Sequence, residues 1–138
     1  MNISMHENLQ SNPHLRAVYE ATQKYILSLD ANVCETEAQR YRAFKYDFGS
    51  KAEGFVEIYF HRLNQKTLDI LARLIPTPAE LELDFVRNKG PSNQNCRYPC
   101  EIKISEFDQL ERAKPLLKRA YERKKNRGPG DTDPFPFS

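Results

Sequence analysis

Basic residues are concentrated in one short segment of this 138-residue chain. Residues 112–127 hold eight basic side chains and one acidic side chain, a local net charge of +7, whereas the whole chain carries +2. A dense strip of cations attracts polyanions, and each phosphate that it neutralises releases a counterion, which favours binding in a salt-dependent way. We therefore expect phosphate-binding side chains in this segment: Lys114, Lys118, Arg119, Arg123, Lys124, Lys125 and Arg127.

Helical spacing divides these cations between two surfaces. Lys114, Lys118 and Lys125 project together, and Arg112, Arg119 and Arg123 lie on an adjoining surface. Basic residues near a helix C-terminus also complement the helix dipole without binding a ligand. Because the charge exceeds what that effect requires, we expect a non-enzymatic binding module that engages a polyanion, in the first place nucleic acid. The alternative is a protein-interaction module, an inhibitor or accessory subunit, that binds an acidic partner protein.

Two carboxylates and a lysine have the types needed for metal-dependent hydrolysis. Glu101 and Lys103 form an E-x-K triplet on a predicted strand, Asp84 lies on an earlier predicted strand, and Glu20 lies on the first predicted helix. This spacing resembles the metal-binding pattern of the PD-(D/E)xK nucleases, in which two carboxylates hold Mg²⁺ and the lysine positions or activates water. Alternating Glu and Lys is also typical of edge strands. A Mg²⁺-dependent nuclease with this degenerate site is therefore the minor alternative.

The sequence lacks the residue patterns of zinc sites, phosphate-binding loops and membrane-spanning segments. A zinc site needs four ligands at characteristic spacing, and Cys96 and Cys100 have no such partners, so we expect reduced thiols. The five glycines form no phosphate-binding loop, and we expect no cofactor. The N-terminus is polar, and no apolar run reaches the ~20 residues needed to span a bilayer, so we expect a cytoplasmic protein without a membrane partner.

The first element that could position these residues is a helix near the N-terminus. Asn12 and Pro13 are typical of the N-cap and the first helical position. The apolar residues that follow recur at helical spacing and predict a helix of about four turns with one buried face. They are Leu15, Val18, Tyr19, Thr22, Tyr25, Ile26 and Leu29.

The middle of the chain predicts strands. Residues 41–48 alternate, with Phe44 and Tyr46 on one face, and residues 55–60 form the second strand of a predicted hairpin. Its aromatic residues could stack on nucleic acid, but aromatics at strand spacing more often form a core, which is our interpretation. Residues 66–74 fit either a strand or a helix, and we favour a strand. Short strands are predicted at 80–85 and 101–104, separated by a loop at 88–95.

The basic segment belongs to a second predicted helix. Ser105 is its predicted N-cap, with Asp108 at the position that completes a capping box. Pro115 conflicts with a helix interior at a cost of about 3 kcal/mol, so we expect a kink or a new start near Lys114. Its predicted buried face comprises Leu110, Ala113, Leu116, Leu117, Ala120 and Tyr121.

Together these elements predict an α+β fold. We expect an antiparallel sheet of four or five strands with an N-terminal and a C-terminal helix packed on it. A single domain should span residues 12–125, between a flexible N-terminus, residues 1–11, and a disordered Pro/Gly-rich tail, residues 126–138.

Three segments carry a resemblance to a known family. Residues 41–45, 55–60 and 115–122 are similar to a small prokaryotic domain family of unknown function, which often forms the C-terminal module of restriction-type and predicted nuclease proteins. The resemblance implies two helices on one face of an antiparallel sheet, and it carries no catalytic residues. The family's frequent neighbours, DNA-cleaving defence proteins, imply nucleic acid or a defence-related protein as the partner.

Overall fold

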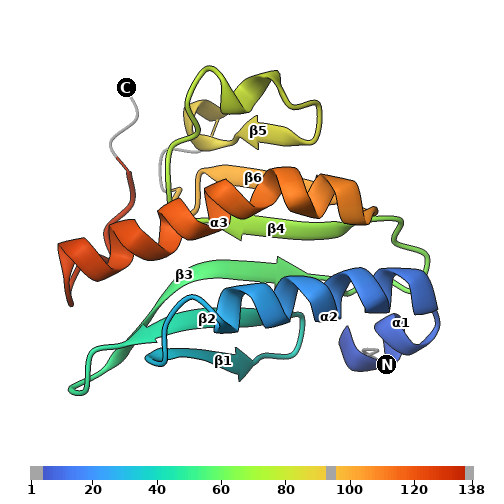
Figure 1. Cartoon of the computed structure of the whole chain (residues 1–138), viewed down its shortest axis with the longest axis horizontal. Coiled ribbons are helices and arrows are strands. Elements are labelled where there is room, and N and C mark those ends of the chain that lie inside the picture. Colours follow the sequence, from blue (N-terminus) through green and yellow to red (C-terminus); the bar gives the residue numbers. More distant parts are fainter. Residues whose placement is uncertain (1–4, 93–95, 136–138) are drawn as a thin grey trace.

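The computed structural model describes residues 5–92 and 96–135 of the chain. They form a six-stranded antiparallel sheet with helices on one face, which confirms the predicted α+β fold (Figure 1). The strand order is β1-β2-β3-β4-β6-β5, with β1 and β5 at the edges. The strands are β1 (Val33–Glu37), β2 (Tyr41–Asp47), β3 (Ala52–Tyr59), β4 (Leu68–Ala72), β5 (Val86–Asn88) and β6 (Cys100–Ile104).

The β2-β3 hairpin positions the centre of the core. Phe44 and Tyr46 of β2 face the helices, as their alternation predicts, and the register shifts between Phe44 and Lys45. Phe44, Phe55 and Phe60 are fully buried. These aromatic rings therefore form a core rather than a platform for stacked bases.

The strand predictions at the other end of the sheet are partly wrong. Residues 66–74 do contain a strand, β4, which pairs with β3 and β6. Residues 80–85 do not form one: a 3-10 helix, η1 (Glu80–Glu82), lies there, because Thr77 and Glu80 exchange side-chain hydrogen bonds to each other's backbone N–H. The predictions also omitted β1 and β5, so the sheet has one strand more than the upper limit that we expected.

Two helices form the N-terminal part of the helical layer, α1 (Met5–Gln10) and α2 (Pro13–Leu27). Asn12 caps α2 by accepting a hydrogen bond from the N–H of Leu15, as predicted. The prediction of a flexible N-terminus is wrong for residues 5–11, because Leu9 is buried and Asn8 donates a hydrogen bond to the carbonyl of Phe60 (3.3 Å). The rest of that prediction, residues 1–4, lies outside the described residues.

Helix α3 (Phe107–Arg127) crosses the same face of the sheet beside α2. It begins one residue later than predicted, with Glu106 as N-cap and Gln109 completing the capping box. The helix continues through Pro115 rather than starting anew near it. No helix in the described part of the chain is long and apolar enough to cross a membrane.

The segment after α3 packs against the domain. Gly128 ends the helix with a φ of 78°, a conformation that favours glycine, and the chain then turns back across the helix. We call residues 128–135 the C-terminal strap. Phe135 is only 7% exposed and its N–H donates a hydrogen bond to the carbonyl of Cys96 (3.0 Å). The predicted disordered tail is therefore wrong for residues 126–135, and residues 136–138 lie outside the described residues.

Candidate nucleic-acid interface

Helix α3 places its basic residues on two flanks of its buried face. Lys114 and Lys125 lie on the flank toward α2, where Lys114 Nζ is 5.2 Å from the centroid of the Tyr25 ring. On the other flank Arg119, Arg123 and Arg127 recur every four residues and line one pocket. The segment that looks continuous in sequence is therefore two separate surfaces in space.

Lys124 does not belong to either surface. Its side chain is 1% exposed, and its Nζ lies 2.5 Å from a carboxylate oxygen of Glu53 on β3. The same amine donates a hydrogen bond to the backbone carbonyl of Asp131 in the strap (2.7 Å). The prediction that Lys124 contacts phosphate is therefore wrong, because a buried charge needs a partner inside the protein and Lys124 already has one.

Glu53 is held in its ionised form by three donors. Burial raises the pKa of this carboxyl, but hydrogen bonds from Lys124, from the Gly130 N–H and from Lys51 outweigh that effect and lower the pKa to about 2. Glu53 accepts from Gly130 at 2.9 Å and lies 3.0 Å from Lys51. One buried carboxylate thus joins β3, α3 and the start of the strap.

The lysine flank is partly neutralised. Lys125 Nζ lies 3.4 Å from Asp30, which also accepts a hydrogen bond from the hydroxyl of Tyr121 (2.5 Å). Lys114 pairs with Glu111 at 2.7 Å. Lys118 is exposed and forms no ion pair with any described residue. This flank therefore offers one unpaired cation and two that are shared with carboxylates.

The arginine flank closes around a pocket of about 560 Å³. Arg119 is bonded to Glu80, and Arg123 pairs with Asp131 of the strap at 2.7 Å. The pocket lining contains four arginines and two aspartates, so it keeps an excess of positive charge. The charged lining residues are Arg73, Arg119, Arg123, Arg127, Asp131 and Asp133.

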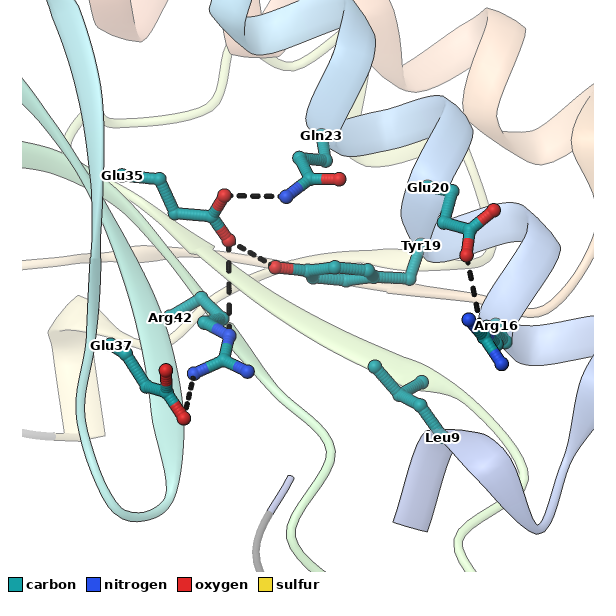
Figure 2. Close-up of a pocket in the computed structure, with 8 residues that line it drawn as sticks. All are labelled: Leu9, Arg16, Tyr19, Glu20, Gln23, Glu35, Glu37 and Arg42. Atoms are coloured by element: carbon teal, nitrogen blue, oxygen red, sulfur yellow. Dashed lines mark hydrogen bonds and ion pairs between the residues drawn. The ribbon is translucent and has the colours of Figure 1, made fainter. Parts of the chain in front are cut away.

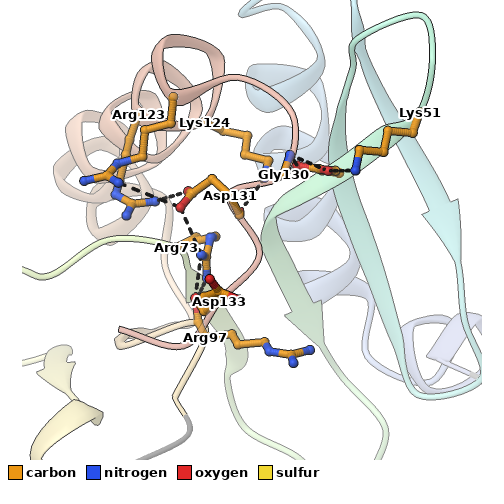
Figure 3. Close-up of polar contacts among 10 residues, drawn as sticks. Lys51, Arg73, Arg97, Arg123, Lys124, Gly130, Asp131 and Asp133 are labelled. Atoms are coloured by element: carbon orange, nitrogen blue, oxygen red, sulfur yellow. Dashed lines mark hydrogen bonds and ion pairs between the residues drawn. The ribbon is translucent and has the colours of Figure 1, made fainter. Parts of the chain in front are cut away.

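Arg73 is the member of this pocket that the sequence predictions missed. It follows β4, is 3% exposed, and donates hydrogen bonds to the backbone carbonyls of Arg97 and Asp133, both at 2.7 Å (Figure 3). Its Nε is buried and forms no hydrogen bond with any described residue. The sequence does contain an indication of this role. Arg73 interrupts an apolar run and is the only charged residue between Asp69 and Glu80, and a charged residue in such a run is rarely buried without a partner.

A second pocket, of about 370 Å³, opens between α2 and the β1-β2 edge (Figure 2). Its centre is Glu35, which accepts hydrogen bonds from the Tyr19 hydroxyl and from Nε2 of Gln23. Arg42 lies 3.9 Å from Glu35 and pairs with Glu37 at 2.8 Å. Burial and the neighbouring Glu35 carboxylate raise the pKa of Tyr19, so this phenol stays protonated and keeps donating.

The residues of the predicted nuclease site do not assemble into one. Glu101 and Lys103 lie on the sheet face away from the helices, and Glu101 pairs with Arg87 (3.5 Å) and Lys89 (3.7 Å). Asp84 lies exposed in the turn before β5, and Glu20 pairs with Arg16 on α2. Among residues 5–92 and 96–135, no group of three or more His, Cys, Asp or Glu side chains is placed to hold a metal ion.

Comparison of the chain with protein-family models, with curated proteins and with solved structures found no match. The resemblance of residues 41–45, 55–60 and 115–122 to a small prokaryotic family therefore stays a prediction. What the chain does has to be argued from its own side chains.

Proposed function

We propose that this protein is a nucleic-acid-binding module that holds backbone phosphates with the arginine flank of α3. The observation that carries the proposal is the meeting of three guanidinium groups, from Arg73, Arg123 and Arg127, around Asp131 in a pocket that Arg119 also lines. Guanidinium groups bind phosphate in a bidentate way, and arginine is the preferred residue wherever such planar recognition is needed.

The charge balance supports this assignment. Asp131, Asp133 and Glu80, which pairs with Arg119, leave the four pocket arginines with one positive charge in excess. Arg112 and Lys118 are both exposed and form no ion pair within the described residues. Cations of this kind attract a polyanion over distances near the Debye length, about 10 Å at moderate salt. Phosphate contacts fix position and read no base sequence, so we expect binding with little sequence preference.

Binding can be measured by fluorescence anisotropy with a labelled oligonucleotide of about 12 nucleotides, single-stranded or duplex. With about three phosphate contacts, affinity for the single strand should fall about 20-fold between about 50 and 200 mM salt. No binding of either form at the lower salt would contradict the proposal. In that case a nuclease-resistant, stoichiometric partner in a pull-down would favour the alternative, an acidic partner protein.

A matched pair of variants separates the pocket from general charge. The double variant Arg119→Gln/Arg127→Gln removes two pocket cations, and Lys66→Gln/Lys103→Gln removes two exposed cations elsewhere. The first should weaken binding about tenfold or more and lower the salt slope by about 1.4, since each lost contact to a single strand contributes about 0.7. Equal effects of the two variants would show that only net charge matters.

A further inference from the structure

The C-terminal strap places an anion among the arginines. Asp131 lies between three guanidinium groups, at 2.7 Å from Arg123, 3.4 Å from Arg73 and 3.9 Å from Arg127. Burial raises the pKa of Asp131, but the charges of Arg73 and Arg123 outweigh it and hold the pKa below its usual range. Asp131 is therefore an ionised carboxylate where a phosphate group of a ligand would be expected.

The strap also places an aromatic ring on the same guanidinium groups. The Phe135 ring centroid is 4.4 Å from Cζ of Arg123 and 5.0 Å from Cζ of Arg73. Stacking between a guanidinium plane and a ring is also how proteins hold unpaired nucleobases. The carboxylate and the ring lie four residues apart on one segment, and both contact Arg73 and Arg123.

The arginines are not fully satisfied by the strap. Nε of Arg73 has no hydrogen-bond partner among the described residues, although its side chain is more than nine-tenths buried. Burial, Arg127 and Arg73 lower the pKa of Arg123 despite its pairing with Asp131. A backbone phosphodiester has one negative charge and two non-bridging oxygens, so it matches the Asp131 carboxylate in charge and in acceptors, and a ligand phosphate in this pocket would also offer an acceptor to Nε of Arg73.

We infer that this pocket is a nucleotide subsite for single-stranded nucleic acid and that the strap is its internal competitor, with Asp131 in place of the phosphate and Phe135 in place of the base. The inference rests on the proposed function and adds which unit of the ligand is held. Gly128 and Gly130, both at positive φ, allow the strap to swing away from the helix. Lys124 stays paired with Glu53 when it does, since neither residue belongs to the strap.

Competition of this kind has a measurable consequence. A ligand whose site is open for only a fraction of the time binds more weakly by that fraction, so loosening the strap should tighten binding. Asp131→Asn removes the internal anion. Asp133→Asn is the matched control, because it makes the same change of charge in the strap, while Asp133 is exposed and contacts Arg73 only through its backbone carbonyl.

The test is anisotropy with fluorescein-labelled oligo(dT) of about 12 nucleotides, on the full chain and its variants. Asp131→Asn should bind about tenfold more tightly than Asp133→Asn, and Phe135→Leu should also bind more tightly than the wild type. Equal affinities of the two Asn variants, or weaker binding by Asp131→Asn, would overturn the inference while leaving the proposed function intact. Absence of binding by every variant would overturn both.

Amide hydrogen exchange of the wild-type protein tests the displacement of the strap without any substitution that could itself change the fold. The N–H of Phe135 and the N–H of Gly130 are both hydrogen-bonded to residues outside the strap, to the carbonyl of Cys96 and to the carboxylate of Glu53. Addition of oligo(dT) should speed their exchange while the amides of β3 keep their protection. Slower or unchanged exchange of the strap amides in the bound protein would show that the ligand does not displace the strap.

Discussion

Glu35 and Glu53 are two carboxylates on the sheet that accept hydrogen bonds from helix side chains, and their surroundings differ. Glu35 on β1 is held by uncharged donors, the hydroxyl of Tyr19 and the amide of Gln23, with Arg42 beyond hydrogen-bond distance. Glu53 on β3 is held by the buried ammonium group of Lys124. Both carboxylates border a pocket, but the side chain of Glu35 is 18% exposed and that of Glu53 only 6%. Water therefore reaches the Glu35 network more easily than the Glu53 pair.

This difference predicts where the domain is fragile. Removing the carboxylate of Glu53 leaves the buried charge of Lys124 uncompensated, whereas removing the carboxylate of Glu35 leaves only uncharged donors that water can reach.

Glu53→Gln should have the largest effect on stability. It leaves Lys124 charged and 1% exposed without a carboxylate, which should lower the free energy of unfolding by about 3–5 kcal/mol. Urea unfolding followed by circular dichroism measures this loss. The double variant Glu53→Gln/Lys124→Met should recover part of it, because the stranded charge is gone. A double variant as unstable as the sum of its parts would show that the two side chains act independently.

The pH dependence of stability should carry the signature of the same pair. The folded-state pKa of Glu53 is about 2, against an ordinary value of 4.5, so unfolding takes up a proton between these values. The stabilisation is complete above about pH 4.5 and is lost as the pH falls through about 2. Thermal unfolding of wild type and Glu53→Gln should therefore converge between about pH 5 and pH 2. A constant difference across that range would refute the assignment.

Glu35→Gln should cost much less, about 1–2 kcal/mol in the free energy of unfolding. The change keeps an acceptor for Tyr19, and Arg42 keeps its ion pair with Glu37 at 2.8 Å. The comparison with Glu53→Gln, measured in the same urea series, is direct because both substitutions remove one carboxylate. Equal losses in the free energy of unfolding would mean that the partly exposed Glu35 carboxylate stabilises the fold as much as the buried pair of Glu53 and Lys124 does.

Tyr19→Phe should have the smallest effect, about 1 kcal/mol, because it removes one donor to Glu35 and keeps the buried ring. Gln23 still donates to that carboxylate. The midpoint of urea unfolding should shift slightly with an unchanged m-value. A loss as large as that of Glu53→Gln would show that the phenol, rather than the carboxylate, organises the pocket.

Local sequence patterns correctly predicted the helices and strands that are determined by residues close together in the chain. Alternation gave the β2-β3 hairpin, and Asn12 with Pro13 gave the start of α2. The residues 80–85 also alternate, yet they form η1, because Thr77 and Glu80 exchange hydrogen bonds like a capping box. That T-x-x-E spacing was readable in the sequence, and it outweighs an alternation of only six residues.

Long-range contacts explain what sequence patterns could not predict. Lys124 lies on the buried side of α3 only because Glu53, 71 residues earlier in the chain, meets it there. The strap is rich in proline and glycine, which is typical of disordered segments, yet Asp131 and Phe135 attach it to Arg73, which follows β4, and to Arg123 of α3. Arg73 was overlooked for the same reason, since its partners lie in the loop before β6 and in the strap.

The segregation of charge along the chain also sets an order for folding during synthesis. Chains emerge from the ribosome with the N-terminal part first, so Asp30, Glu53 and Glu80 are exposed to solvent before α3, which carries their partners, has been made. Until then α2 covers only part of the apolar face of the sheet, and Glu53 lacks its ammonium partner. A nascent chain interrupted before residue 112 would be acidic and would expose part of the apolar face of its sheet, which is the kind of surface that chaperones bind. Helix α3 would then complete the fold in a late step.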